Sequence, residues 1–206
     1  MGMKSIIGIG LFVVFATNVA FCSPIVFTFT GTAAGTLGGT AFTNASFTVS
    51  SLADTSQVSL VGSTYQVQAS SSSVSIAGFA TATFNGPTYW GSPLGSSDII
   101  FGNSAISGAT GLLGITKVEL LTYDLKSAIG PLFSGLDFES AVFHNFQNIS
   151  TSQGALTLVA ANDTFTATLV PEPLSILLAG MGLAALLFRH LRRPPSTNSV
   201  SRNSLA

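Results

Sequence analysis

The sequence predicts an all-β protein: a single antiparallel β-sandwich, jelly-roll-like, between an N-terminal signal peptide and a C-terminal transmembrane helix. Three observations predict it. Through the central region, apolar residues alternate with hydroxyl residues at the period of two that is typical of half-buried strands. Clusters of Gly, Ser and Asn separate these stretches, as turns do. Long apolar runs occur at the two ends of the chain, at residues 6–16 and 174–188.

The composition limits the class of protein. The 206 residues are enough for about one domain. With 47% hydrophobic and only 7% charged residues, the chain is too apolar to be disordered. Two of its seven basic residues and all eight acidic residues lie between the apolar runs, so this central region has a net charge of −6. Because a nucleic-acid surface needs clustered Lys and Arg, we expect no nucleic-acid partner.

Residues 1–22 have the three parts of a secretory signal peptide: Lys4, an apolar run and small residues. As a helix, the eleven apolar residues would span about 16 Å, too short for a hydrocarbon core of about 30 Å. We expect cleavage after Cys22, with an uncleaved anchor and a lipid-modified Cys22 as alternatives. Cys22 is the only cysteine, so packing must stabilise the exported domain without an intrachain disulfide.

Residues 23–169 are predicted to form the sandwich. Near the end of this region we expect a strand at 156–160, a turn at 161–163 and then the last strand. The final two strands would therefore form a hairpin. Residues 112–125 fit either a strand pair or a short helix. Sixteen Phe against one Trp and three Tyr favour a core with few polar groups. The clearest alternating stretches are Ile25/Phe27/Phe29, Phe47/Val49, Ala80/Ala82/Phe84 and Phe165/Ala167/Leu169.

The central region contains no recognisable catalytic or metal-binding constellation, and we expect neither an enzyme nor a cofactor. His144 is its only histidine, and no serine lies in a G-x-S-x-G elbow, which argues against Ser-His-Asp hydrolysis and against a zinc site. Asp137 and Glu139 fall on one face of an expected strand, where paired carboxylates can serve a glycosidase or bind calcium. The same spacing is typical of a solvated strand face, so a secreted hydrolase and a calcium site are alternatives only.

Tyr89 and Trp90 lie in the Gly- and Pro-rich segment 87–91, which predicts a loop. Because an exposed loop aromatic can stack on the face of a sugar ring, these two residues are the candidate carbohydrate contact. The alternative is an aromatic plug that covers one end of the sandwich.

Three T-x-T stretches are expected to form a polar, solvent-exposed sheet face. A flat ice-binding array is the alternative, but such an array needs a regular repeat to align its threonines, and the sequence has none. The stretches are Thr28/Thr30, Thr81/Thr83 and Thr164/Thr166/Thr168.

Residues 170–193 carry three elements in order. The two prolines predict a stiff extended break that exposes the glutamate between them. As a helix, the apolar run would rise about 22 Å, which is short for a bilayer but compatible with local thinning. The arginines mark the cytoplasmic side by the positive-inside rule, and 194–206 form a polar cytoplasmic tail. The elements are Val170, Pro171, Glu172 and Pro173, then the apolar run 174–188, then Arg189, Arg192 and Arg193.

This segment resembles the PEP-CTERM sorting signal of Gram-negative bacteria, which is also described as an ice-binding protein C-terminal domain. All three elements match in order, and the departure is the tail 194–206, since family members usually stop soon after the basic cluster. The resemblance implies recognition by an exosortase, a membrane cysteine protease that cuts near the Pro-Glu-Pro. It also implies export through the inner membrane, transient anchoring by the helix, and delivery to the cell surface or extracellular matrix, in association with exopolysaccharide or biofilm.

Overall fold

The computed structural model describes residues 23–103, 111–133, 143–171 and 181–182. The predicted signal peptide and most of the predicted sorting segment therefore lie outside the described residues. The described part of the central region is all-β with antiparallel strand pairs, as the sequence predicts. The chain divides into one unit that ends at Val170 and a second that begins at Pro171. We call the described part of the first unit the body.

Three strands of the body are much longer than the others. β1, β2 and β12 have 14 to 16 residues, whereas the remaining strands have nine or fewer. Two short 3-10 helices, η1 (Thr55–Gln57) and η2 (Val118–Leu120), follow β2 and β9. The strands are β1 (Pro24–Leu37), β2 (Thr40–Asp54), β3 (Ser59–Val61), β4 (Thr64–Gln68), β5 (Ser71–Ile76), β6 (Ala82–Thr83), β7 (Tyr89–Pro93), β8 (Asp98–Gly102), β9 (Gly111–Thr116), β10 (Ile129–Phe133), β11 (Phe143–Thr151) and β12 (Gly154–Leu169).

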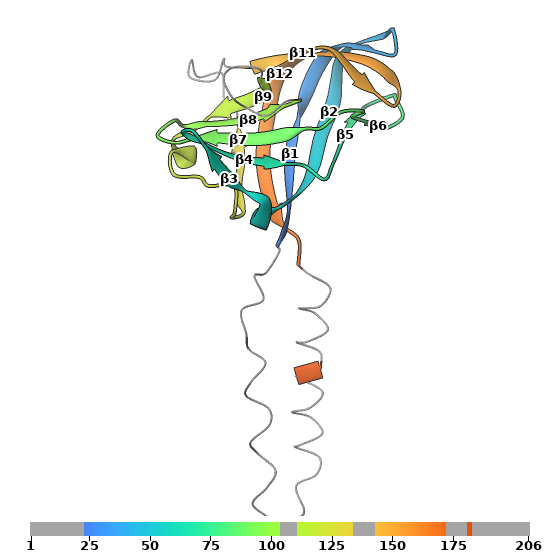
Figure 1. Cartoon of the computed structure of the whole chain (residues 1–206). Coiled ribbons are helices and arrows are strands. Elements are labelled where there is room, and N and C mark those ends of the chain that lie inside the picture. Colours follow the sequence, from blue (N-terminus) through green and yellow to red (C-terminus); the bar gives the residue numbers. More distant parts are fainter. Residues whose placement is uncertain (1–22, 104–110, 134–142, 172–180, 183–206) are drawn as a thin grey trace, which may run out of the picture. The chain divides into compact units, whose positions relative to one another are not determined.

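The strands form two sheets with a common core. In the first sheet, β11, β12, β1, β2, β5 and β6 are successive neighbours, and β10 pairs with the second half of β12. β3, β4, β7, β8 and β9 form the second sheet. β11 joins the sheets, because it pairs with β9 as well as with β12. Figure 1 shows the strands of the second sheet crossing in front of β1 and β12.

The core between the sheets is built around aromatic rings. Phe27 and Phe29 of β1 and Phe165 of β12 come from the first sheet, and Trp90 and Phe101 come from the second. The Trp90 ring lies 4.9 Å from Phe27, 5.3 Å from Phe29, 5.1 Å from Phe101 and 5.6 Å from Phe165, measured between centroids. All five side chains are fully buried, so these rings hold the two sheets together.

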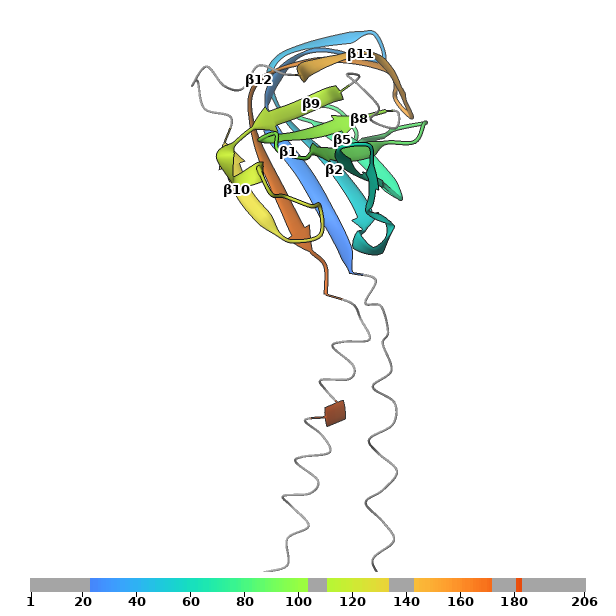
Figure 2. The same ribbon diagram turned by 60° about the vertical axis from the view of Figure 1, so that its left-hand side comes forward.

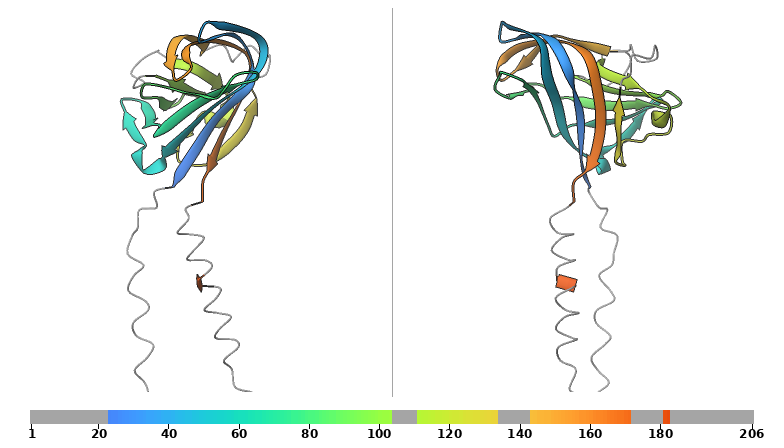
Figure 3. Two further views of the ribbon diagram at one scale, coloured as in Figure 1. Left: turned by 90° about the vertical axis from the view of Figure 1, so that its right-hand side faces the viewer. Right: turned by 180° about the vertical axis from the view of Figure 1, so that it is seen from behind.

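Irregular pairings bend the long strands. The register shifts after Thr32 in the β1–β12 pair, after Ala33 in the β1–β2 pair and after Phe146 in the β11–β12 pair. Asn44 and Asn148 lie in two of these irregular stretches with φ angles of 51° and 53°, a region that Asn enters more readily than most residues. Such bulges bend and twist a strand. Figures 2 and 3 show the result, with β1, β2 and β12 curving over the upper part of the body toward β11.

The predicted turn at 161–163 is wrong. Residues 154–169 form one continuous strand, in which Asn162 pairs with Thr32 and Asp163 pairs with Gly31. Asp163 is 3% exposed, which is unlike a turn residue. The polar pair Asn-Asp favours a turn locally, but β1 supplies a partner along the whole length of β12. The extra residue between Ala160 and Asn162 is therefore accommodated as a bulge.

The other strand predictions have mixed outcomes. The alternation predicted for β1, β2 and the end of β12 is confirmed, since Phe27, Val49 and Phe165 are fully buried. The stretch 112–125 is one strand, β9, followed by η2, and so combines the two alternatives. The strand expected at 80–84 is reduced to the two residues of β6, which pair with β5, and Phe84 beside it forms an isolated bridge with Thr151 of β11.

Gly31 and Gly35 of β1 approach β12 too closely for any side chain. A Cβ atom at Gly31 would lie 1.8 Å from the carbonyl oxygen of Asn162, and one at Gly35 would lie 1.9 Å from that of Thr157. Because both obstacles are backbone atoms, a side chain at either position would force the two strands apart.

We therefore expect Gly31→Ala to lower the free energy of unfolding by at least about 2 kcal/mol, within the range for overpacked sites. Urea unfolding followed by the fluorescence of Trp90, the only tryptophan, measures the change. Gly86→Ala is the matched control, because a Cβ there would have no atom within 4 Å. The control should shift the free energy by less than about 0.5 kcal/mol. Equal stability of the two variants would contradict the close approach.

Candidate functional site

The first and last strands bring the two ends of the body together. Ile25 pairs with Leu169, and the Val170 N–H donates a hydrogen bond of 2.8 Å to the Pro24 carbonyl oxygen. Leu52 of β2 is near them, since it pairs with Val26 only two residues beyond Pro24. Figure 1 shows the start of β1 beside the end of β12. We call this region the shared end; it consists of Ser23, Pro24, Leu52, Leu169 and Val170.

The predicted sorting residues begin directly at the shared end. Val170 belongs to the body by its hydrogen bond to Pro24, one residue beyond the boundary predicted from the sequence. Pro171 follows and is exposed. Within the described part of the chain, no helix is long and apolar enough to cross a membrane. The remaining predicted sorting residues lie outside the described residues; they are Glu172, Pro173, Arg189, Arg192 and Arg193.

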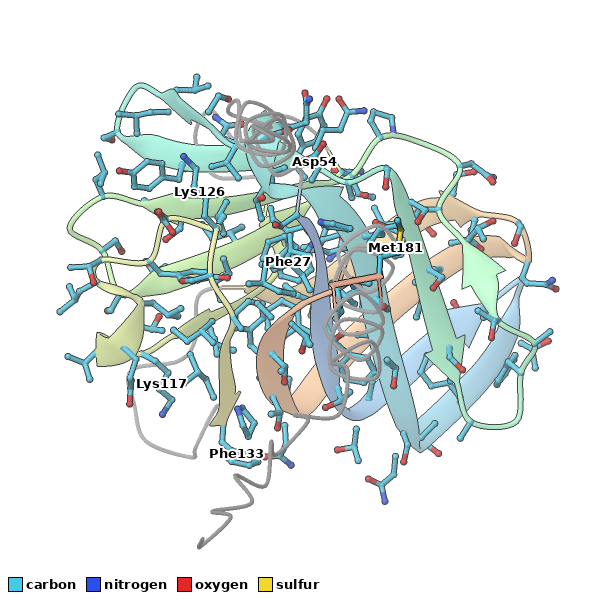
Figure 4. All side chains as sticks on the ribbon, turned by 90° about the horizontal axis from the view of Figure 1, so that it is seen from below. Phe27, Asp54, Lys117, Lys126, Phe133 and Met181 are labelled. Atoms are coloured by element: carbon cyan, nitrogen blue, oxygen red, sulfur yellow. The ribbon has the colours of Figure 1, made fainter. Side chains whose placement is uncertain are left out.

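The shared end carries exposed apolar side chains. Leu52, Leu169 and Val170 are 38%, 40% and 38% exposed. Asp54, the last residue of β2, accepts a hydrogen bond of 2.8 Å from the Ser56 N–H through Oδ1, which caps η1. Figure 4 views the structure from below and labels Asp54. Leu52 lies in the row of Val26 and Thr168 on the outer face of the first sheet, and Leu169 lies in the row of Ile25 on its core face. The shared end therefore combines apolar side chains on both faces of the sheet with a small polar helix.

Trp90 is not the exposed loop aromatic that the sequence predicts. It lies in β7, is 0% exposed and is surrounded by the four phenylalanine rings of the core. A ring with no exposed surface cannot stack on a sugar, so the carbohydrate contact predicted for Trp90 is wrong. Its neighbour Gly91 suggested a loop, but Gly91 is a strand residue that pairs with both Gln66 and Ile100. Tyr89, also in β7, is half-buried.

The other candidate residues do not form a reactive cluster among the described residues. Asp137 and Glu139 lie outside the described residues, so no calcium or hydrolase geometry is assigned to them. The backbone of His144 lies in β11 opposite Leu113. In the described ranges, no group of three His, Cys, Asp or Glu could hold a metal ion.

The strand pairing creates a hydroxyl-rich face on the first sheet. One row across the sheet runs through Thr166, Thr28, Ser50 and Ser73, and the next through Thr164, Thr30, Thr48 and Ser75. We call these eight residues the hydroxyl face; all are half-buried or exposed, and none is charged. Neighbouring residues are about 4.8 Å apart across strands and about 6.8 Å apart along a strand.

The polar sheet face expected from the T-x-T stretches of β1 and β12 is therefore confirmed. Thr83, from the remaining T-x-T stretch Thr81/Thr83, pairs with Ser73 at the border of the hydroxyl face. Phe133 of β10 pairs with Thr164 and is 64% exposed, which places an accessible aromatic ring at the end of one row. Because neighbouring strands rotate by about 20° relative to each other, the rows are twisted and do not form a flat array.

Comparison with protein-family models, with curated proteins and with solved structures finds no match to this chain.

Tyr123 is a buried titratable group beside the core. It is 5% exposed, its ring centroid lies 6.5 Å from that of Phe165, and its O–H donates a hydrogen bond of 2.9 Å to the Ser127 carbonyl oxygen. Burial raises the pKa of the Tyr123 phenol well above its usual range, and the negative charge of Asp124 raises it further. The phenol therefore keeps its proton in the folded chain at alkaline pH.

We expect the stability of the protein to fall above pH of about 10, where an unfolded tyrosine loses its proton but the folded Tyr123 retains it. Above pH 10, this one group lowers the free energy of unfolding by up to about 1.4 kcal/mol per pH unit. Below pH 10 the phenol is protonated in both the folded and the unfolded state, so Tyr123 causes no pH dependence there. Tyr123→Phe should lower the free energy of unfolding by about 1 kcal/mol at pH 7, because the hydrogen bond is lost. Its decline above pH 10 should be shallower. Urea unfolding between pH 7 and 11 measures both, and parallel declines would contradict the assignment.

Proposed function

We propose that this protein is a non-enzymatic bacterial surface or extracellular-matrix protein, exported through the inner membrane and sorted by an exosortase through residues 170–193. Its body is a jelly-roll-like sandwich between two membrane-targeting segments. The observation that carries this proposal is the shared end. Both targeting segments continue from neighbouring residues, Pro24 and Val170, which are joined by a hydrogen bond.

This arrangement suits a chain whose two ends enter the same membrane during export. β12 alone has 16 residues, which correspond to about 50 Å of extended strand before bending. If the chain left the body at opposite ends of such a strand, a long linker would be needed to bring one end back to the bilayer. Antiparallel pairing of the first strand with the last makes the linker unnecessary. The return of the last strand to the side of the first also supports the jelly-roll-like assignment, since Greek keys share this feature.

We expect deletion of residues 171–193 to release the body from the membrane fraction into the soluble exported fraction. The deletion begins at Pro171, because removal of Val170 would also remove its hydrogen bond to β1. Glu172→Gln tests sorting separately: the chain should stay in the inner membrane and reach the surface at least tenfold less. Glu119→Gln, an acidic residue of η2, is the control and should be sorted normally. Cell fractionation compares these three variants with the unaltered chain, and unchanged surface retention of the deleted chain would overturn the proposal.

A second candidate function is contact with a neutral polysaccharide through the hydroxyl face. The candidate replaces the predicted contact at Trp90, which is buried, and keeps an exposed aromatic, Phe133, next to Thr164. Eight hydroxyl side chains without a charge offer both donors and acceptors to the hydroxyls of a sugar chain. A twisted sheet suits a flexible polymer better than the flat surface of ice. Association with exopolysaccharide would then occur through this face.

We expect Thr30→Glu to weaken retention in affinity electrophoresis through a gel that contains a neutral β-glucan. The bulky charged side chain would interrupt the row of hydroxyl groups between Thr164 and Thr48. The dissociation constant for the glucan should therefore rise at least fivefold. Thr122→Glu is the matched control, because Thr122 is exposed in the turn after η2 and lies outside the hydroxyl face. Equal retention of the two variants would refute the assignment of the hydroxyl face.

A further inference from the structure

We propose that the shared end rests in the headgroup region of the bilayer for as long as the C-terminal segment is anchored. The contact is made by the exposed side chains of Leu52, Leu169 and Val170. This inference rests on the proposed function, because it requires the apolar run 174–188 to lie in the membrane. It adds a defined orientation of the body and names the side chains that meet the lipid.

The covalent length of the chain limits how far the body can lie from the bilayer. Val170 is hydrogen-bonded to Pro24, and the apolar run begins at Leu174. Four steps between Cα atoms separate these two residues, and they span at most about 14 Å whatever their conformation. The headgroup region of one leaflet is about 5–8 Å thick, which is half the difference between the whole bilayer and its hydrocarbon core. When Leu174 is at the edge of the hydrocarbon core, the shared end therefore lies in or directly beside the headgroups.

The length of the apolar run adds to this limit. Its fifteen residues would rise about 22 Å as a helix, less than the hydrocarbon core of about 30 Å. A bilayer accommodates a short span by thinning around it, or the flanking residues are drawn inward. Each adjustment moves the shared end toward the hydrocarbon and none moves it away.

The chemistry of the shared end suits an interface. Three partly exposed aliphatic side chains gain free energy when they leave water, at roughly 25 cal/mol for each Å² that is buried. Ser56 and Gln57 of η1 are exposed beside them and provide polar groups for the headgroups. η1 is held next to the start of β1, because the Thr55 N–H donates a hydrogen bond of 3.2 Å to the Ser23 carbonyl oxygen. A mixed apolar and polar surface of this kind is typical of segments that lie at the level of the headgroups.

Depth-dependent quenching of a fluorescent label tests the orientation in the full-length chain. In a Cys22→Ser background, a bimane label is attached at Leu52→Cys or at Val159→Cys. Val159 is the matched control, because it is an exposed aliphatic residue, 50% exposed, that lies ten residues before Leu169 on the same strand. Ser56→Cys provides a second label at the shared end, in case Leu52→Cys impairs folding. The chains are placed in phosphatidylcholine vesicles with and without a lipid that carries a nitroxide in its headgroup.

We expect the nitroxide to quench the labels at positions 52 and 56 at least threefold more strongly than the label at position 159. Equally weak quenching at all three positions, in a chain that sediments with the vesicles, would overturn the inference and leave the membrane anchor intact. If the unlabelled full-length chain does not sediment with the vesicles, the proposed anchor fails, and the inference fails with it. The two failures are therefore distinguished by sedimentation.

Discussion

The antiparallel pairing of β1 with β12 is the constraint on which the rest of the structure depends. It extends from Ile25 opposite Leu169 to Leu37 opposite Leu156 and so joins residues that are 119 to 144 positions apart in the sequence. On one face it sets Phe27 and Phe29 beside Phe165, and on the other face it aligns the hydroxyl rows. At its open end it places the two exits of the body side by side. The core, the polar face and the shared end are thus three consequences of one register.

The chain has one cysteine and so cannot form an intrachain disulfide, and aromatic packing stabilises the core instead. Trp90 makes ring contacts with four phenylalanines, each worth about 0.5–1.5 kcal/mol beyond the burial of its area. Its Nε1–H has no hydrogen-bond partner among the described residues, which costs about 1–3 kcal/mol. The ring contacts together outweigh this cost, so a tryptophan is tolerated where its polar atom is not satisfied. The role of the buried Trp90 indole is therefore structural. Because this ring cannot reach a ligand, a ligand site must be sought on the outer faces of the sheets.

The sequence predicts what depends on local pattern and fails where distant strands decide. The alternation of Phe27 and Phe29 with Thr28 identified an inward face and an outward face correctly, because a period of two is visible in a few residues. The continuity of β12 through Asn162 and Asp163 could not be read locally, because those residues favour turns unless a partner strand supplies their hydrogen bonds. The sequence predicts the polar face of the sheet but not the alignment of its residues into rows, for a related reason. Each T-x-T stretch was visible, but their alignment depends on a register between strands at opposite ends of the chain.

Two prolines determine where this pairing stops, and this has consequences for both proposals. Pro24 is the first residue of β1, a position that tolerates the absence of an N–H, and its carbonyl oxygen accepts the last hydrogen bond of the pair. Pro171 has no N–H to donate, so the ladder cannot extend beyond Val170. The body therefore ends directly at the predicted sorting residues, with no spacer between them. In the proposed sorting, a protease that cuts near Glu172 would have to act close to the folded body. In the proposed anchoring, the short chain between Val170 and Leu174 would keep the body near the bilayer. In the two proposals, recognition of the segment and orientation of the body therefore both depend on the stretch that begins at Val170 and Pro171.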